Sequence, residues 1–212
     1  MSFKVTRALA AAAALAAAVG SGALAAAPAS AATTQCGSVC ASFYPLSTGT
    51  SDVLAVEHAS GTKASTGQAV SIAAASSTNQ AEDWYLNDEG TVEDFYQAGL
   101  ISAGMALHWG NDQVYEIDYY PDATYTGECL GTTASNGSGS VTLQPCGVSA
   151  STLWAADTAD ASGRALPLIN GKNNNYSNPY SLTASSVGAQ LSSSQLLGVT
   201  SSQEWGTIYG VL

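Results

Sequence analysis

Aromatic and acidic side chains alternate at short spacing between residues 108 and 120, the densest such cluster in the chain. A sugar-binding site needs an aromatic face for the apolar side of a pyranose ring and fixed polar partners for its hydroxyls. Trp109 would be the stacking platform, and Glu116 or Asp118 would accept hydrogen bonds. The residues predicted to bind a ligand are Trp109, Tyr115, Tyr119, Glu116, Asp118 and, further along the chain, Gln203. The alternative is structural, because alternate apolar residues of one strand usually face a core.

A second candidate is the asparagine-rich stretch Asn173–Asn178, which reads NNNYSN. Its amide groups could hydrogen-bond to a glycan. The alternative is a solvated turn, since Asn and Ser are preferred turn residues.

The sequence gives little support for catalysis. Glycoside hydrolysis needs two positioned carboxylates, and Glu116 and Asp118 on one strand face form such a pair. In an acidic chain, however, carboxylate pairs are expected on the surface without any catalytic role. No G-x-S-x-G motif, EF-hand-like loop, histidine cluster or glycine-rich phosphate loop is present. We therefore expect a non-catalytic protein without a cofactor or metal, with a glycoside hydrolase as the alternative.

Short strand-like segments separated by Gly, Asn, Asp and Ser clusters predict an all-β fold. No window after residue 31 shows the apolar period of a helix. Three stretches share one pattern, in which a strand-like alternation leads through a small polar loop to a single Trp. Their apolar entry residues lie 14, 13 and 14 positions before Trp84, Trp154 and Trp205. A unit that recurs three times predicts a threefold assembly, with these tryptophans as core residues.

The spacing of the tryptophans differs between units. Trp84 to Trp154 spans 70 residues and Trp154 to Trp205 spans 51, so the second unit carries about twenty extra residues. We expect this excess to form a β-hairpin over Gly99–Tyr120, with its turn at residues 110–112.

The second unit resembles a repeat of the ricin-B-type β-trefoil lectins. It contains Cys129-Leu130-Gly131, then the strand Val141–Gln144, Cys146 and Trp154, and the third unit keeps an intact Q-x-W motif at residues 203–205. The resemblance implies a single β-trefoil over residues 32–212, with repeats at about 42–86, 87–156 and 157–212, and a sugar-binding role. A β-sandwich is the alternative fold.

The polar residues of the lectin site are missing from this pattern. In the family an Asp after Cys-Leu accepts hydrogen bonds from sugar hydroxyls. Gly131 stands there in the second unit, and the equivalents are Ala55 in the first unit and Leu182 or Thr183 in the third. The resemblance therefore predicts the fold more firmly than a lectin site of the family type.

The ends and the composition predict export. Residues 1–31 combine the basic Lys4 and Arg7, an apolar run and an A-x-A exit, as in a secretory signal peptide. Four cysteines follow, and in an oxidising compartment they are expected to pair. Of three possible pairings we favour Cys129–Cys146 with Cys36–Cys40.

The formal net charge of −11 becomes −13 when Lys4 and Arg7 are removed with the leader. Such a surface repels nucleic acid and anionic lipid, so we expect neither partner and no membrane insertion after leader removal. The sequence predicts a secreted, extracellular, monomeric module that binds a neutral or cationic glycan. The alternative is a protein-binding module, such as an inhibitor of secreted hydrolases or a cell-surface structural protein.

Overall fold

A computed structural model of the chain describes residues 40–57, 59, 63–76, 79–161 and 165–209. All of them fall within one compact unit, Thr33–Leu212. The predicted signal peptide, residues 1–31, and Cys36 lie outside the described residues.

Twelve strands follow one another in this described part, in three consecutive sets of four. The first set comprises β1 (Ala41–Pro45), β2 (Asp52–Val56), β3 (Val70–Ala74) and β4 (Trp84–Thr91). The second set comprises β5 (Gln113–Tyr119), β6 (Glu128–Thr132), β7 (Gly139–Pro145) and β8 (Leu153–Ala156). The third set comprises β9 (Leu166–Asn170), β10 (Tyr180–Thr183), β11 (Ser192–Gln195) and β12 (Glu204–Tyr209). Short 3-10 turns lie at η2 (Gly49–Ser51), η3 (Gln80–Glu82) and η4 (Pro121–Ala123).

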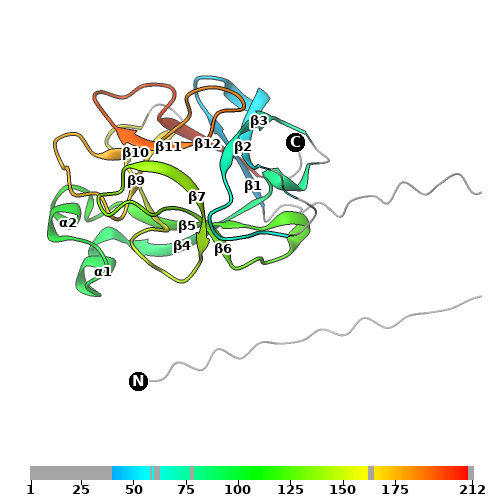
Figure 1. Cartoon of the computed structure of the whole chain (residues 1–212). Coiled ribbons are helices and arrows are strands. Elements are labelled where there is room, and N and C mark those ends of the chain that lie inside the picture. The colour runs from blue at the N-terminus through cyan, green and yellow to red at the C-terminus, as the bar shows by residue number, and fades with distance from the viewer. Residues whose placement is uncertain (1–39, 58, 60–62, 77–78, 162–164, 210–212) are drawn as a thin grey trace, which may run out of the picture. The chain divides into compact units, whose positions relative to one another are not determined.

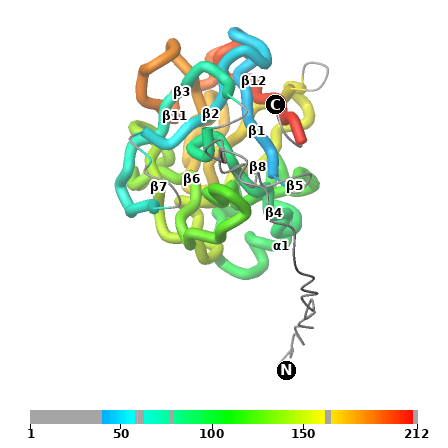
Figure 2. Tube along the Cα trace, turned by 90° about the vertical axis from the view of Figure 1, so that its right-hand side faces the viewer, coloured from blue at the N-terminus to red at the C-terminus, as the bar shows by residue number. Residues whose placement is uncertain are grey.

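The first and fourth strands of each set form a closed barrel. Its order is β5-β4-β1-β12-β9-β8, and β8 pairs back to β5. Figure 2 shows β1 beside β12, the antiparallel pair that joins the two ends of the chain's strand order. The second and third strands of each set form the hairpins β2–β3, β6–β7 and β10–β11. This arrangement is an all-β trefoil, and the closed barrel excludes the alternative β-sandwich.

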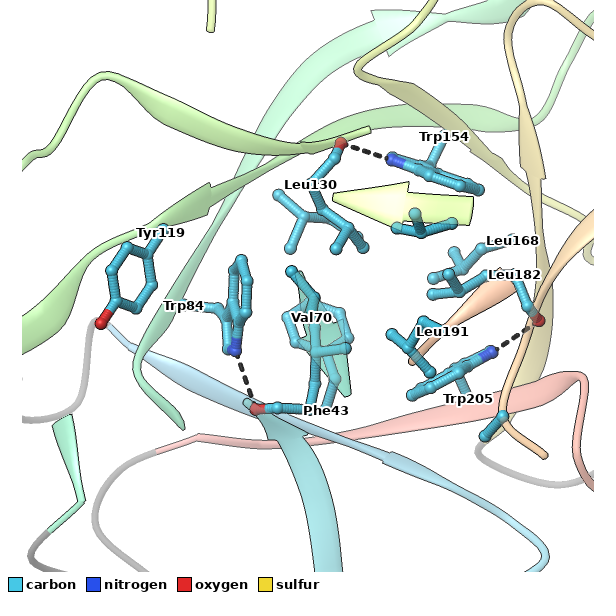
Figure 3. Close-up of a cluster of buried hydrophobic side chains, with 14 of the residues drawn as sticks. Phe43, Val70, Trp84, Tyr119, Leu130, Trp154, Leu168, Leu182, Leu191 and Trp205 are labelled. Carbon is cyan, nitrogen blue, oxygen red and sulfur yellow. Dashed lines mark hydrogen bonds between the residues drawn. The ribbon is translucent and has the colours of Figure 1, made fainter. Parts of the chain in front are cut away.

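The three predicted core tryptophans occupy equivalent places in the three sets. Trp84, Trp154 and Trp205 are at most 3% exposed. Each indole Nε1 donates a hydrogen bond to a carbonyl of the second strand in its own set, Leu54, Leu130 and Leu182 respectively, at 2.9 to 3.0 Å. Figure 3 shows these three bonds around the shared apolar core. The tryptophans therefore fasten each hairpin to the barrel as well as filling the core.

The predicted hairpin over Gly99–Tyr120 is wrong in its first half. Only its second strand exists, as β5, and β5 pairs with β4 instead of with a strand over residues 99–109. The residues between β4 and β5 contain two helices, α1 (Val92–Gln97) and α2 (Ala103–Trp109). Hence the excess length of the second unit is a helical pair at the tip of the β4–β5 ribbon.

Local capping explains why these residues are helical. Thr91 and Asp94 form a reciprocal capping box, in which each side chain accepts a hydrogen bond from the other residue's backbone N–H. Ser102 caps α2 by accepting from the Met105 N–H. Short helices need tertiary packing, and these two bury a few apolar side chains at helical spacing.

The buried side chains of α1 and α2 form a second core against the barrel wall. Its helical members are Val92, Phe95, Met105 and Trp109, and β8 and β9 supply apolar partners. Figure 1 shows both helices together at one end of the fold, away from the β2–β3 hairpin. The insertion is thus a fixed part of the domain, and it presents α2 to the loop that follows β9.

The predicted disulfide Cys129–Cys146 is present and joins β6 to the end of β7. The predicted pairing Cys36–Cys40 stays a prediction, because Cys36 lies outside the described residues.

Candidate functional site

The residues predicted to bind a ligand do not share one exposed surface. Trp109 is 7% exposed and belongs to the second core. Tyr119 is fully buried in the main core, where its ring lies 5.4 Å from that of Trp84. Burial and the nearby Asp83 raise the pKa of Tyr119 to about 12. Neither ring offers a free face on which a sugar could stack.

Glu116 is a structural carboxylate. It is 3% exposed and accepts hydrogen bonds from the Val148 N–H at 2.9 Å, the Gly147 N–H at 3.3 Å and the Thr152 hydroxyl at 2.5 Å. These donors belong to the loop between β7 and β8. Glu116 is therefore committed to holding the loop that precedes Trp154.

Asp118 lies against the disulfide. It is 6% exposed, and its Oδ1 is 3.0 Å from the Cys129 sulfur. Desolvation, followed by the charges of Glu116 and Glu89, raises the pKa of Asp118 to about 7. Since a disulfide sulfur carries no proton, a hydrogen bond between the two atoms requires a protonated Asp118.

The side-chain amide of Gln203 is also fully engaged within the protein. It is 4% exposed, and its amide donates to the Thr183 hydroxyl and to the carbonyls of Ser194 and Gln195. Tyr115 is half-buried at one end of the barrel, apart from the other predicted residues.

The three positions of the family's sugar-binding Asp are unsuited to that role. Because Leu54, Leu130 and Leu182 are equivalent, the positions are Ala55, Gly131 and Thr183. A Cβ at Gly131 would lie 2.9 Å from both the Gln144 side chain and a backbone oxygen of residue 151. The Thr183 hydroxyl is already bonded to its neighbours. None of the three positions therefore offers a carboxylate, and Gly131 has no room for a larger side chain.

A different hollow combines both sequence candidates. It lies between α2 and the asparagine-rich loop, and we name it the α2 groove. Its volume is about 360 Å³, and it is lined by His108, Trp109, Asp157, Ala159, Asp160, Tyr176, Ser177, Asn178, Pro179, Leu196, Gly198 and Val199.

Stacked aromatic rings form one wall of the α2 groove. The exposed His108 ring is parallel to that of Tyr176, with centroids 5.4 Å apart and planes 11° apart. The Tyr176 hydroxyl shares a hydrogen bond with that of Ser102 at 2.8 Å. Gly104 makes this position possible, because a Cβ there would meet the Tyr176 ring at 2.0 Å. Three residues of one helical insertion thus fix the tyrosine of a distant loop.

The loop itself is held by buried asparagine. Asn173 is almost fully buried, and its Oδ1 accepts hydrogen bonds from the backbone of Asn175 and Tyr180. Its amide donates toward the Met105 sulfur of α2 at 3.6 Å. The interpretation of this stretch as a solvated turn is therefore incomplete. Asn173 has a structural role, and its hydrogen bonds position the loop so that Tyr176 and Asn178 line the groove.

Two carboxylates, Asp157 and Asp160, also line the α2 groove. Asp157 is 4% exposed, and its Oδ1 accepts from the backbone of Ala159 and Asp160. Its Oδ2 has no hydrogen bond to any residue that the structure describes. Burial and the charge of Asp157 raise the pKa of Asp160. None of the described residues that line the groove is Lys or Arg, so the groove suits a neutral or cationic ligand better than an anion.

A second hollow of about 570 Å³ shares the ridge formed by His108, Trp109 and Ala159. It adds Glu93 and Asp112, and the pKa of Asp112 is raised mainly by burial. A ligand longer than one sugar ring could therefore extend across the ridge.

Sequence reasoning named His108, Trp109 and the asparagine-rich loop separately but missed their meeting point. Two signals in the sequence could have revealed it, the T-x-x-D capping box at Thr91 and the Met105–Trp109 spacing of four residues. Both indicate helix, and only the helix brings His108 to Tyr176. Nothing in the sequence marked Asp157.

Comparisons with known proteins agree with the fold. No protein-family model and no curated protein matches the chain. A designed threefold symmetric protein, ThreeFoil, matches 80% of this chain and 97% of its own, with a TM-score of 0.52 and 17% identity. A mosquitocidal holotoxin matches 80% of this chain with a TM-score of 0.51 and 14% identity, and 17% of the toxin chain is covered. At these identities the likeness shows the fold alone, an all-β trefoil.

None of the helices in the described part of the chain has the length and apolar character needed to cross a membrane. The buried disulfide Cys129–Cys146 is compatible with an extracellular protein.

Proposed function

We propose that this protein is a secreted, non-catalytic carbohydrate-binding module whose ligand, a neutral or cationic glycan, occupies the α2 groove. The observation that carries the proposal is the exposed His108 ring stacked on Tyr176, in a groove that Asp157 and Asn178 also line. An aromatic face with convergent acceptors and amides is the combination that saccharides need.

The charges around the groove support the stated ligand class. Asp157 and Asp160 lie in the groove, and Asp112 and Glu93 lie across the ridge. These carboxylates can accept hydrogen bonds from hydroxyls or pair with the amino groups of a cationic glycan. They would repel a sulfated or uronic polymer.

A binding role is favoured over hydrolysis because the carboxylate pair that could have been catalytic is inaccessible. Glu116 and Asp118 are both at least 94% buried, and Glu116 is consumed by the loop before Trp154. A glycosidic bond cannot reach them in this fold.

The resemblance of residues 129–154 to a ricin-B-type repeat supports the same class of function. Because Ala55, Gly131 and Thr183 cannot provide that family's site, the proposed site is distinct from it. The inserted helices would then carry a site of their own, apart from the repeats.

The test is binding to immobilised chitin, chitosan, cellulose and starch, with heparin as the anionic comparison. We expect retention on at least one neutral or cationic polymer, and loss of at least tenfold in affinity for Tyr176→Ala. Tyr96→Ala is the matched control, since Tyr96 is an exposed tyrosine of α1 outside the groove. No retention on any polymer, or equal retention of all three proteins, would contradict the proposal.

A protein partner is the second candidate, and exposed apolar residues favour it. Leu107 is 82% exposed beside the second hollow, and Leu197, beside the groove residue Leu196, is 73% exposed. Isolated exposed leucines are normal, but two near one groove could anchor a protein loop. Stoichiometric inhibition of a secreted protease or glycosidase, lost in Leu107→Ser, would favour this alternative.

A further inference from the structure

The end of the barrel opens into a second, apolar pocket that is unrelated to the α2 groove. Its volume is about 180 Å³. Every barrel strand contributes to its wall, through Phe43, Leu86, Tyr115, Ala156, Leu168 and Trp205. We name it the barrel-mouth pocket.

The size and lining of this pocket suit a small ring compound rather than a cluster of water. A comparably lined cavity of about 150 Å³ in another protein stays dry and takes up benzene. Phe43, Leu168 and Trp205 are almost fully buried and are members of the main core. The inner wall therefore offers no polar partner for water.

The outer rim carries hydroxyl groups. Thr207, Tyr115 and Tyr209 line the pocket, and their side-chain hydroxyls form no hydrogen bond to any residue in the described part of the chain. Tyr115 is half-buried, and burial, the charge of Asp88 and the nearby Tyr209 raise its pKa. Three available hydroxyls at the rim of an apolar pocket are the arrangement that orients an amphipathic ligand.

The charge around the pocket restricts the class of ligand further. Asp88 faces the Tyr115 phenol closely enough to perturb it, and no Lys or Arg is among the described lining residues. An anionic group would therefore be repelled at the rim.

We propose that the barrel-mouth pocket binds a small, uncharged ring compound, of the size of benzene or slightly larger, with one hydroxyl or carbonyl directed to the rim. Its ring contacts Phe43, Leu168 and Trp205. Its polar group hydrogen-bonds to the hydroxyls of Tyr115 and Tyr209 at the rim. This site is independent of glycan binding in the α2 groove.

The test uses p-cresol as the probe and the backbone amide NMR spectrum of the folded protein as the readout. We expect saturable shifts at the barrel strands around the pocket, with a Kd on the order of 1 mM, as befits so small a ligand. Benzoate, an anion of similar size, should bind at least fivefold more weakly.

Two kinds of variant test the location. Thr207→Leu fills the pocket and should abolish the shifts, whereas Tyr115→Phe and Tyr209→Phe keep its shape and should weaken binding two- to fivefold. Tyr85→Phe, an exposed tyrosine on β4 that does not line the pocket, is the matched control. If Thr207→Leu does not fold, the two phenylalanine variants decide.

Absence of saturable binding, shifts that map away from the barrel mouth, or binding unchanged in both phenylalanine variants would overturn the proposal. The glycan assay is a separate readout, so that failure of one site leaves the other standing.

Discussion

Burial assigns structural roles to side chains whose types suggested ligand binding. Gln203 pins the loop before Trp205, and Glu82 holds the corresponding loop before Trp84 by accepting from the Ser76 N–H and the Asn79 amide. In the second unit Thr152 takes the equivalent position and relies on Glu116 from β5. The three repeats therefore hold the loop before the core Trp with different residues.

Removing Glu116 should unfold the protein more easily. Glu116→Ala removes the acceptor of the Gly147 and Val148 N–H groups and of the buried Thr152 hydroxyl, and we expect a loss of about 1–3 kcal/mol in the free energy of unfolding. Urea denaturation measures it. The control is Glu93→Ala on the exposed face of α1, which should change stability by less than about 0.5 kcal/mol. Similar losses in both variants would contradict the structural role of Glu116.

Asp118 should make stability depend on pH. Its pKa in the folded protein is about 7 and its ordinary value is 3.8. The folded state thus keeps a proton that the unfolded chain releases, and the stabilisation present below about pH 4 is lost as the pH rises to about 7. Asp118→Asn removes this dependence. Between pH 4 and pH 8 we expect wild type to lose on the order of 3 kcal/mol relative to Asp118→Asn. Parallel pH profiles of the two proteins would show that the Asp118 pKa is ordinary.

At the scale of elements, the helical insertion is the part that sequence reasoning assigned wrongly. Strand propensity of single residues in 100–109 suggested a hairpin, but Ser102 supplies a cap and Met105 and Trp109 share a buried face. A helix of seven residues has too few turns for its apolar period to stand out. Its stability comes from packing on β8 and β9, which the sequence does not display.

Gly104→Ala should weaken glycan binding without destabilising the fold. A Cβ at this position would overlap the Tyr176 ring, which lies at the far end of a side chain and can move away. Alanine favours helix over glycine by about 1 kcal/mol, so that the melting temperature should change little. Glycan affinity should fall at least tenfold, measured by the same binding assay.

Ala106→Gly is the complementary control, because it loosens α2 without touching the Tyr176 seat. It should lower the melting temperature by a few degrees and leave affinity within about twofold. Unchanged binding in Gly104→Ala would separate Tyr176 from ligand recognition.

At the scale of the whole molecule, the threefold architecture could be predicted because its signal repeats. One Trp in each unit, at nearly equal distance from its entry strand, reflects one structural role performed three times. The site could not be predicted, because it is built where the threefold symmetry is broken. His108, Asp157 and Tyr176 come from one insertion and two loops, and only the closed barrel brings them together.

Substitution of the three equivalent tryptophans should lower the free energy of unfolding by similar amounts. Trp84→Phe, Trp154→Phe and Trp205→Phe each remove one buried indole N–H and its hydrogen bond to a strand carbonyl, and each should cost about 2–4 kcal/mol. Trp109→Phe lies in the second core, and no indole hydrogen bond to a described residue is lost with it. It should cost less. Chemical denaturation of the four variants tests this order, and a Trp109→Phe loss larger than the other three would refute it.

We propose that the α2 groove, and not a trefoil repeat, is where this protein binds its ligand. The most direct measurement is a backbone amide NMR titration with the soluble oligosaccharide of whichever polymer retains the protein. We predict that the largest shifts fall in residues 103–109, 157–160 and 173–178. Shifts centred instead on Ala55, Gly131 or Thr183 would contradict the account, because they would show that the repeats bind sugar despite their missing carboxylates.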